Sequence, residues 1–298
     1  MSAVISLCIA ILSSASMALI LKIFRNQNGN RYGILLGNYL TCTVLAGILM
    51  PKGEAGLPVG GLTAGSLTAG GITWLCGICA GILFVAGLVS MQGSVGKNGA
   101  ILTSAFSKLG LIVPLLVSVL FFGERVRMIQ IPGIILVLAA FLLISFDSEK
   151  APAVKGGKVY PLLLLAVLVF CGGGDAMAKV FEETGQRAWD GMYFLILFAA
   201  AACLTLVLLL AEKKRSGKKV IGKEFAAGFL VGIPNYFSSS LLLKALTGLP
   251  AFVVYPCFSA GTLLLVTLIA VPVFKERPGV KTWTGLACIT AALILLNI

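Results

Sequence analysis

The chain has 298 residues, of which 59% are hydrophobic and only 11% are charged. A soluble domain carries about 25% charged residues because water must wet its surface, so this composition excludes an ordinary soluble protein and predicts a surface that faces lipid. Lys and Arg number 23 against 11 Asp and Glu, which gives a net charge of +12, and His is absent. Without His, the chain can form no His-based catalytic triad, His metal site or His proton relay.

The eight Cys residues all lie inside apolar stretches, where Cys usually acts as a small buried hydrophobic side chain. Cys76 and Cys79 have the spacing of a zinc or redox pair, but the sequence places no second pair and no base beside them. We therefore expect no metal site and no other cofactor.

Ten apolar runs are each long enough to cross a bilayer, which takes about 20 residues. The predicted transmembrane helices cover, in chain order, 2–23, 32–50, 69–91, 98–121, 128–146, 159–181, 190–211, 225–245, 250–273 and 281–297. The first run is too long for the apolar part of a signal peptide and no basic residue precedes it. The runs are continuously apolar, whereas the strands of a membrane barrel alternate. The sequence predicts an all-α integral membrane protein.

The two halves of the chain resemble each other. The segment that starts at Phe121 matches the segment that starts at Val273, an offset of 152 residues. The identical pairs include Phe122 and Phe274, Glu124 and Glu276, Arg125 and Arg277, Gly133 and Gly285, Ala139 and Ala291, and Ala140 and Ala292. Two further pairs of glycines, Gly77 with Gly81 and Gly228 with Gly232, have the small-xxx-small spacing that lets helices approach closely in lipid.

This duplication predicts two repeats of five spans each, 1–150 and 151–298. Because five is an odd number, the second repeat crosses the membrane in the opposite direction to the first. Inverted five-helix repeats are typical of transporters, whose substrate site lies near the midplane where the repeats meet.

Two turns carry a resemblance to a known family. Gly123-Glu124-Arg125 follows the fourth run and Lys275-Glu276-Arg277 the ninth, and each turn precedes a Gly and an Ala-rich helix. With these turns, essentially the whole chain resembles the ten-helix EamA-like branch of the drug/metabolite transporter superfamily. The resemblance implies secondary transport of small metabolites or drugs without ATP hydrolysis. The chain also has no GxxxxGK(S/T) nucleotide-binding motif.

Positive charges are distributed unevenly between the two sides of the predicted bundle. The loops opposite the N-terminus carry 16 Lys and Arg residues, six of them in 213–223, and the N-terminal side carries 6. Because cytoplasmic loops collect Lys and Arg, this bias predicts that both termini lie outside. The resemblance implies the opposite orientation, and we base the prediction on the charges. The basic run 212–223 is predicted to contact anionic lipid rather than nucleic acid.

Two charged residues lie deep inside predicted spans, where each costs roughly 2.5–3.5 kcal/mol on insertion. Lys108 lies in the middle of the fourth span, and Asp175 follows three glycines in the sixth. In the functional interpretation, Asp175 binds a cation or exchanges a proton, and Lys108 is an anion anchor or countercharge. In the structural alternative, Asp175 pairs with Lys179 one turn later, and Lys108 binds a backbone carbonyl.

Polar and aromatic side chains also occur near the middle of spans. They suit the wall of a substrate cavity or, alternatively, hydrogen bonds between helices, and they are Asn38, Tyr39, Asn235, Tyr236, Ser239 and Tyr255. Glu124 and Glu276 lie at turns ahead of the next span, so we expect a structural role, because acidic groups favour helix N-termini.

We therefore expect a secondary transporter of a small metabolite or drug, in the cytoplasmic membrane, that works by alternating access and is not an enzyme. Its expected partners are a small-molecule substrate, membrane lipid and the proton as candidate coupling ion, without nucleic acid, and it would act as a monomer or homodimer. The alternatives are a non-transporting membrane partner protein and an intramembrane enzyme, for which the sequence offers one deep carboxylate and no His.

Overall fold

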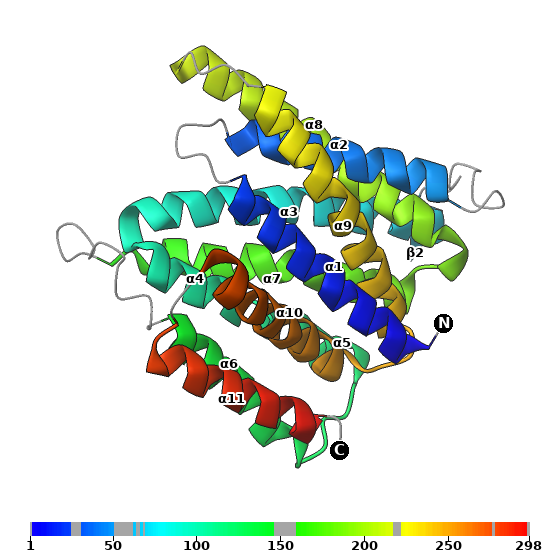
Figure 1. Cartoon of the computed structure of the whole chain (residues 1–298). Coiled ribbons are helices and arrows are strands. Elements are labelled where there is room, and N and C mark those ends of the chain that lie inside the picture. Colours follow the sequence, from blue (N-terminus) through cyan, green and yellow to red (C-terminus); the bar gives the residue numbers. More distant parts are fainter. Residues whose placement is uncertain are drawn as a thin grey trace.

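The structure is a computed structural model that describes residues 2–24, 31–50, 62–63, 66–67, 69–145, 159–216, 222–275 and 278–296. Helices account for nearly all of them (Figure 1): α1 (Ala3–Ile23), α2 (Arg31–Leu49), α3 (Ala69–Asn98), α4 (Ala100–Leu109), α5 (Ile112–Phe122), α6 (Gln130–Ser145), α7 (Pro161–Thr184), α8 (Asp190–Ser216), α9 (Gly222–Leu246), α10 (Ala251–Phe274) and α11 (Val280–Leu296). A 3₁₀ helix, η2 (Arg187–Trp189), precedes α8, and the two-residue strands β1 (Leu62–Thr63) and β2 (Ser66–Leu67) pair antiparallel.

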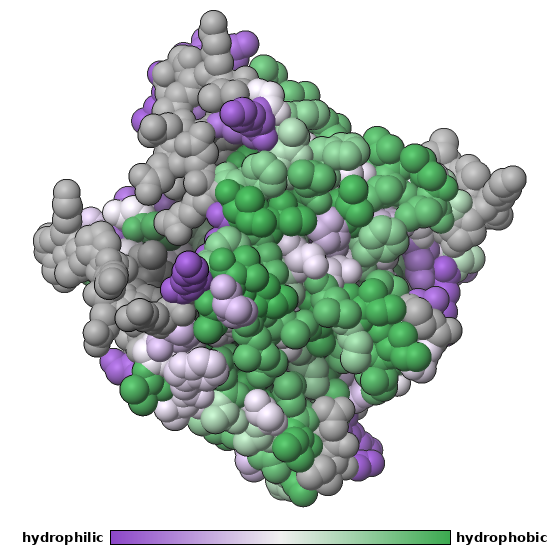
Figure 2. Space-filling model, viewed as in Figure 1, coloured by the Kyte–Doolittle hydropathy of each residue, from purple (hydrophilic) through white to green (hydrophobic). Residues whose placement is uncertain are grey.

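The prediction of an all-α membrane protein is confirmed. Within the described residues, eight helical stretches are long and apolar enough to cross a membrane, whereas α6 and α11, with 16 and 17 residues, are shorter. Large apolar side chains face outward, among them Ile48, Leu120 and Leu162, which are 71%, 72% and 79% exposed. Figure 2 shows a face with a broad apolar centre and hydrophilic side chains toward its left and right edges, as lipid around the helices requires.

The predicted span 98–121 overlaps a stretch of membrane length, Leu102–Phe122, but it consists of two helices rather than one. Helix α4 ends at Leu109 and α5 begins at Ile112, with Gly110 and Leu111 between them. Pro114 explains the break: it has no N–H to donate to the carbonyl of Gly110, and its ring crowds that carbonyl. Tighter bonds replace the helical ones, since the N–H groups of Gly110 and Leu111 donate to the carbonyls of Ser107 and Lys108 at 3.2 and 3.4 Å.

Glycines bring helices from the two halves of the chain into backbone contact. A Cβ on Gly228 of α9 would overlap the carbonyl of Ile34 in α2, and one on Gly81 of α3 would lie 2.5 Å from the carbonyl of Leu197 in α8. Both members of each predicted small-xxx-small pair lie at these two crossings, because Gly232 packs on Thr41 and Gly77 on Ile196. The predicted role of these glycines is therefore confirmed.

Two apolar cores lie side by side in the bundle. The first joins α1, α6, α10 and α11 with the end of α9, and the second joins α2, α3 and α8 with parts of α7 and α9. Helices α6 and α11 pack against each other at one edge of the bundle (Figure 1). Helix α7 packs on α3, α4 and α5, so it runs through the centre of the molecule.

Replacing Gly228 by Ala is expected to destabilise the fold, because the added methyl group overlaps the backbone of α2. Overpacking of this kind costs about 1–3 kcal/mol. Gly93→Ala is the matched control, since a methyl group there meets nothing within 4 Å and Ala is the better helix former by roughly 0.5–1 kcal/mol. Thermal unfolding in detergent should show a lower midpoint for Gly228→Ala and an equal or higher one for Gly93→Ala. Equal midpoints for Gly228→Ala and the unmodified chain would contradict the crossing.

Candidate functional site

Helices α4 and α7 meet at a crossing that positions Lys108 and Asp175. A Cβ on Gly172 would overlap the carbonyl of Gly110, so the two backbones touch where α4 ends. One turn away, Ser107 Oγ donates a hydrogen bond to Cys171 Sγ at 3.7 Å. Lys108 follows Ser107 in the chain and Asp175 lies one helical turn after Cys171, so the crossing brings the two charged residues to the same place.

Lys108 and Asp175 lie within electrostatic range of each other without forming an ion pair. The two side chains interact electrostatically, and both are partly exposed. Within the described part of the chain, neither the ammonium nor the carboxylate has a hydrogen-bond partner or an opposite charge at ion-pairing distance. The site thus holds a basic and an acidic side chain that are near each other and not in contact.

Two tyrosines from the second half of the chain surround Asp175. The Tyr255 hydroxyl of α10 donates a hydrogen bond of 2.7 Å to the Asp175 carbonyl oxygen, and Tyr193 of α8 lies within electrostatic range of the Asp175 carboxylate. Tyr193 is fully buried, and its hydroxyl has no hydrogen-bond partner among the described residues. Tyr255 belongs to the first apolar core and Tyr193 to the second, so Asp175 lies where the two cores meet.

The predicted alternative for Asp175, a pair with Lys179, is wrong. Lys179 Nζ lies 2.8 Å from Glu124 Oε1, 2.8 Å from Glu182 Oε2 and 2.6 Å from Glu183 Oε1. The Lys179 side chain is only 3% exposed. Three carboxylates therefore surround this ammonium, and Asp175 is left without it.

Glu124 links the two halves of the chain. Besides its ion pair with Lys179, it accepts two hydrogen bonds from the backbone N–H of Ala251, at 2.9 and 3.2 Å. The sequence correctly predicted a structural role at a helix N-terminus, but the helix is α10 and not the following α6. Glu276, its counterpart in the second half, lies outside the described residues.

The ionisation of Glu124 contributes to stability above acidic pH. Burial raises the pKa of its carboxyl group, but hydrogen bonds that include those of Lys179 and the Ala251 N–H outweigh burial, so the pKa lies below its ordinary value. Since the folded-state pKa is depressed, the stabilisation is present above the ordinary Glu pKa of about 4.3 and is lost as the pH falls through the lower folded-state value.

Asn38 and Asn235 contact each other. Asn235 Nδ2 donates to Asn38 Oδ1 at 3.1 Å, and Cys42 Sγ donates to the Gly232 carbonyl at 3.2 Å. These bonds connect α2 with α9 beside the glycine crossing. They are the interhelical hydrogen bonds that the sequence left open as an alternative to a cavity wall.

The remaining predicted residues lie apart from the charged pair. Tyr39 and Tyr236 are buried in an aromatic cluster with Phe198, at ring distances of 6.5 and 6.4 Å. Ser239 is partly buried on α9, and its neighbour Ser238 donates to the Ala10 carbonyl at 3.2 Å. Of the eight predicted residues, the structure therefore brings together Lys108, Asp175 and Tyr255.

Sequence reasoning missed three features of the site. Glu182 and Glu183 lie three and four residues after Lys179, a spacing that predicts ion pairs along a helix. The Ser107–Cys171 contact and the position of Tyr193 depend on how α4, α7 and α8 cross, and the sequence carries no signal for them. Within the described residues, no group of three or more Cys, Asp or Glu side chains could hold a metal ion.

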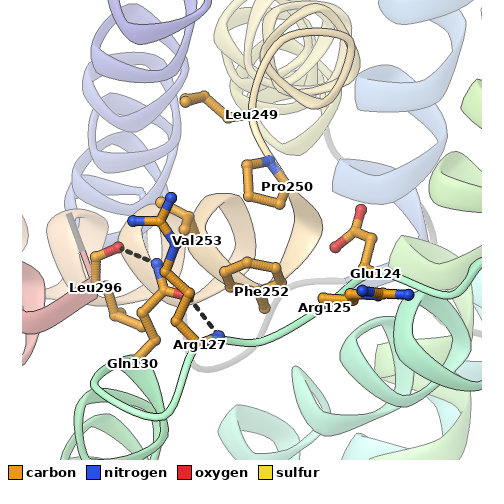
Figure 3. Close-up of a pocket in the computed structure, with 9 residues that line it drawn as sticks. All are labelled: Glu124, Arg125, Arg127, Gln130, Leu249, Pro250, Phe252, Val253 and Leu296. Atoms are coloured by element: carbon orange, nitrogen blue, oxygen red, sulfur yellow. Dashed lines mark hydrogen bonds between the residues drawn. The ribbon is translucent and has the colours of Figure 1, made fainter. Parts of the chain in front are cut away.

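A pocket of about 420 Å³ opens at the connection between α5 and α6 (Figure 3). Figure 3 shows Glu124 and Arg125 on one side of Phe252 and Arg127 on the other. Gln130 closes the lower wall, where its Nε2 donates to the Leu296 carbonyl at 3.3 Å. A second pocket of about 440 Å³ contains Lys97, whose ammonium lies 5.1 Å from the centre of the Tyr160 ring. Lys108 and Asp175 line neither pocket.

Comparisons with known proteins give a fold but no function. No protein-family model matches the chain. An uncharacterized protein of Haemophilus influenzae is 26% identical over 296 residues, which are 98% of this chain and 97% of that protein. One crystal structure of a protein matches 98% of this chain and 95% of its own, with a TM-score of 0.69 and 16% identity. At this identity, the match shows that the two chains share a fold.

Lys179→Met is expected to destabilise the protein strongly, because three carboxylates would remain together without their cation. Removing one partner of a buried ion pair costs about 3–5 kcal/mol. Glu183→Gln is the matched control, since the Glu183 side chain is 35% exposed and an exposed pair contributes about 0–1 kcal/mol. Thermal unfolding of the purified variants measures both. Similar losses of thermal stability in the two variants would show that the buried Lys179 cluster does not stabilise the fold more than an exposed ion pair does.

Proposed function

We propose that this protein is a secondary transporter of a small metabolite or drug in the cytoplasmic membrane, driven by ion coupling or exchange. The observation that carries the proposal is the pair Lys108 and Asp175, an acidic and a basic side chain inside apolar stretches of membrane length that interact electrostatically without contact. Because charges inside a membrane are costly, residues that keep them there mark substrate and ion pathways.

The packing of the helices supports two inverted repeats of five spans. In the proposed repeats, α1 corresponds to α7, α2 to α8, α3 to α9, α4 with α5 to α10, and α6 to α11. In this correspondence, the contact between α3 and α7 matches the contact between α9 and α1. The contact between α3 and α8 matches the contact between α9 and α2. The contact between α5 and α7 likewise matches the contact between α10 and α1. The contacts of α2 with α8 and of α6 with α11 each join two corresponding helices, so each is its own counterpart. Every major contact thus has its symmetric counterpart.

The ends of the helices support the same symmetry. Gly123 ends α5 and Lys275 ends α10, both in the left-handed conformation, with φ of 66° and 53°. The two residues are separated by the repeat offset of 152. In addition, α1 begins and α11 ends at the same side of the bundle, the right side of Figure 1, as an even number of crossings requires.

In alternating access the two repeats move relative to each other, and the contacts of Glu124 join the repeats at one end of the bundle. Glu124 belongs to the first repeat, whereas Lys179 and Ala251, which it binds, belong to the second. A movement that separates the repeats at this end of the bundle has to break these contacts, and a movement at the other end leaves them intact. The cluster therefore stabilises the conformation that the structure shows.

In this proposal Asp175 binds a cationic group or carries the coupling proton, and Lys108 binds an anionic group or acts as the countercharge. Tyr255 fixes the backbone at Asp175. Helices α2, α8 and α9 are joined to one another through the side chains of Asn38, Asn235, Tyr39 and Tyr236, apart from the charged pair. The EamA-like branch of the drug/metabolite transporter superfamily is the family that we propose, on the two turns quoted above.

Neutralising either charge is expected to abolish transport. Proteoliposomes loaded with a defined mixture of amino acids, nucleosides and cationic drugs should release or exchange at least one solute, and Lys108→Met or Asp175→Asn should reduce this by more than about tenfold. Lys244→Met is the control, since Lys244 is an exposed residue on α9. Chemical conversion of a solute instead of exchange would favour a membrane enzyme. Full exchange by both neutralised variants would refute the assignment of the site.

The proposed orientation places both termini outside and the basic end of α8 in the cytoplasm, since cytoplasmic loops collect Lys and Arg. Arg215, an exposed residue at that end, can be tested as Arg215→Cys in a chain whose native Cys residues are replaced. A membrane-impermeant thiol reagent should label the variant only after the cells are opened. Labelling in intact cells would reverse the orientation.

A further inference from the structure

We propose that a groove between the end of α3 and the start of α7 binds one anionic phospholipid, with the lipid phosphate on Lys97 and an acyl chain along the apolar wall. The groove is the pocket of about 440 Å³ that contains Lys97. It is separate from the charged pair, because neither Lys108 nor Asp175 lines it. The inference therefore stands independently of the proposed transport function.

The groove lies at one end of two helices of membrane length. Lys97 is in the last turn of α3, which ends at Asn98, and Tyr160 directly precedes α7, which begins at Pro161. Both helices are long and apolar enough to cross a membrane. We therefore expect these ends at the boundary between the hydrocarbon and the lipid headgroups. Lys and Tyr suit this boundary, because each has an apolar body and a polar tip.

The wall of the groove is apolar and continues onto the outer surface of the bundle, where Val159 is 52% exposed and Leu162 79%. Besides Lys97 and Tyr160, the lining residues all have apolar side chains, and they are Val159, Pro161, Leu162, Leu163 and Ala166. A soluble anion on Lys97 would leave this wall uncovered, whereas an acyl chain covers it. The combination of one cation with an exposed apolar wall favours a lipid over a soluble anion.

The Lys97 ammonium supplies the charge that selects an anionic headgroup. It lies 5.1 Å from the centre of the Tyr160 ring, and among the described residues no carboxylate lies at ion-pairing distance from it. A phosphate can pair with the ammonium while the ring stays beside it. The ammonium of a zwitterionic headgroup would be repelled by Lys97 and would compete with it for the ring. A headgroup with a net negative charge, such as that of phosphatidylglycerol, is the better match.

Buried hydrogen bonds hold Tyr160 at the groove without using Lys97. Asn98 Oδ1 accepts from the Tyr160 N–H at 2.7 Å, and Asn98 Nδ2 donates to the Tyr160 carbonyl at 3.4 Å and to Ser94 Oγ at 3.1 Å. The hydroxyl groups of Ser94 and Thr103 are 2.8 Å apart. The side chains of Asn98, Ser94 and Thr103 are buried. The network thus organises the groove before a lipid binds, which lowers the cost of binding.

The proposed orientation supplies the lipid that the groove selects. The end of α3 lies three crossings away from the N-terminus, on the side that carries most of the Lys and Arg residues. In the proposed orientation this side faces the cytoplasm, and the cytoplasmic leaflet has a negative surface potential. The groove would therefore meet anionic lipid in that leaflet.

Native mass spectrometry with equal amounts of phosphatidylglycerol and phosphatidylcholine of matched acyl chains tests the charge. The unmodified protein should retain phosphatidylglycerol in preference, and Lys97→Met should lower this preference by about fivefold, the value of one Lys near an anionic lipid surface. Lys97→Arg keeps the charge and should keep the preference. Lys214→Met is the matched control, since Lys214 is exposed near the end of α8 and does not line the groove. Equal losses in Lys97→Met and Lys214→Met, or no preference in the unmodified protein, would overturn the proposal.

Two further measurements distinguish a lipid from a soluble anion and locate it. Glycerol phosphate carries the charge of the headgroup without acyl chains, so it should not displace phosphatidylglycerol at equal concentration. Displacement would identify a site for soluble anions and overturn the lipid. A phosphatidylglycerol with a photoreactive group on its acyl chain should cross-link to a peptide that contains residues 159–166. Cross-links confined to other parts of the protein would overturn the placement.

Thermal unfolding in detergent provides a check on folding. A ligand that binds only the folded chain raises the midpoint of unfolding. Phosphatidylglycerol should raise it more than phosphatidylcholine for the unmodified protein, and the two lipids should act equally on Lys97→Met. Without added lipid the two proteins should unfold at similar temperatures, because Lys97 is exposed and the hydrogen bonds that hold Tyr160 do not involve its side chain. An equal gain from phosphatidylglycerol in both proteins would contradict a phosphate on Lys97.

Discussion

In lipid, two apolar helices gain little from covering each other, because the hydrocarbon around them is equally apolar, so their association depends on how closely their backbones approach. This fold meets the constraint with glycines. Gly228 lies on the backbone of α2, Gly81 on that of α8, and Gly172 on the carbonyl of Gly110. Three of the crossings that join distant parts of the chain therefore lack a side chain at the point of contact, and each sets the register of the helices it joins.

The crossing of α4 and α7, where Gly172 lies on the carbonyl of Gly110, positions the charged site. Lys108 lies two residues before Gly110 and Asp175 three residues after Gly172, so a shift of either helix along the other would separate them. The crossing also coincides with the boundary between the two apolar cores, one containing Tyr255 and the other Tyr193. At that boundary, the charged side chains displace the least apolar packing.

The sequence was sufficient for the features that depend on a single helix. Each apolar run of membrane length is helical, and all but 98–121 form a single helix, since lipid leaves the backbone no other partners. The depth of Lys108 and Asp175 in the membrane stays a prediction from their positions within apolar runs. The break at Gly110 was missed, although Pro114 lies within one turn of it. Contacts between helices could not be predicted from the sequence. No pattern in it indicates that Glu124 binds Ala251, 127 residues away, or that Asn38 binds Asn235. Such pairs depend on crossings, which pattern and spacing along one helix do not determine.

The two proposed repeats differ in the side chains at one pair of corresponding crossings. At the offset of 152, the counterpart of Lys108 is Ala260, a fully buried residue of α10. Its neighbour Gly261 packs on Ile11 of α1, so the crossing that corresponds to the charged site is filled with apolar side chains. In the proposed repeats, the charged pair thus lies on one side only, and close packing occupies the symmetric position. This asymmetry favours a functional over a structural role for Lys108 and Asp175 in our proposal.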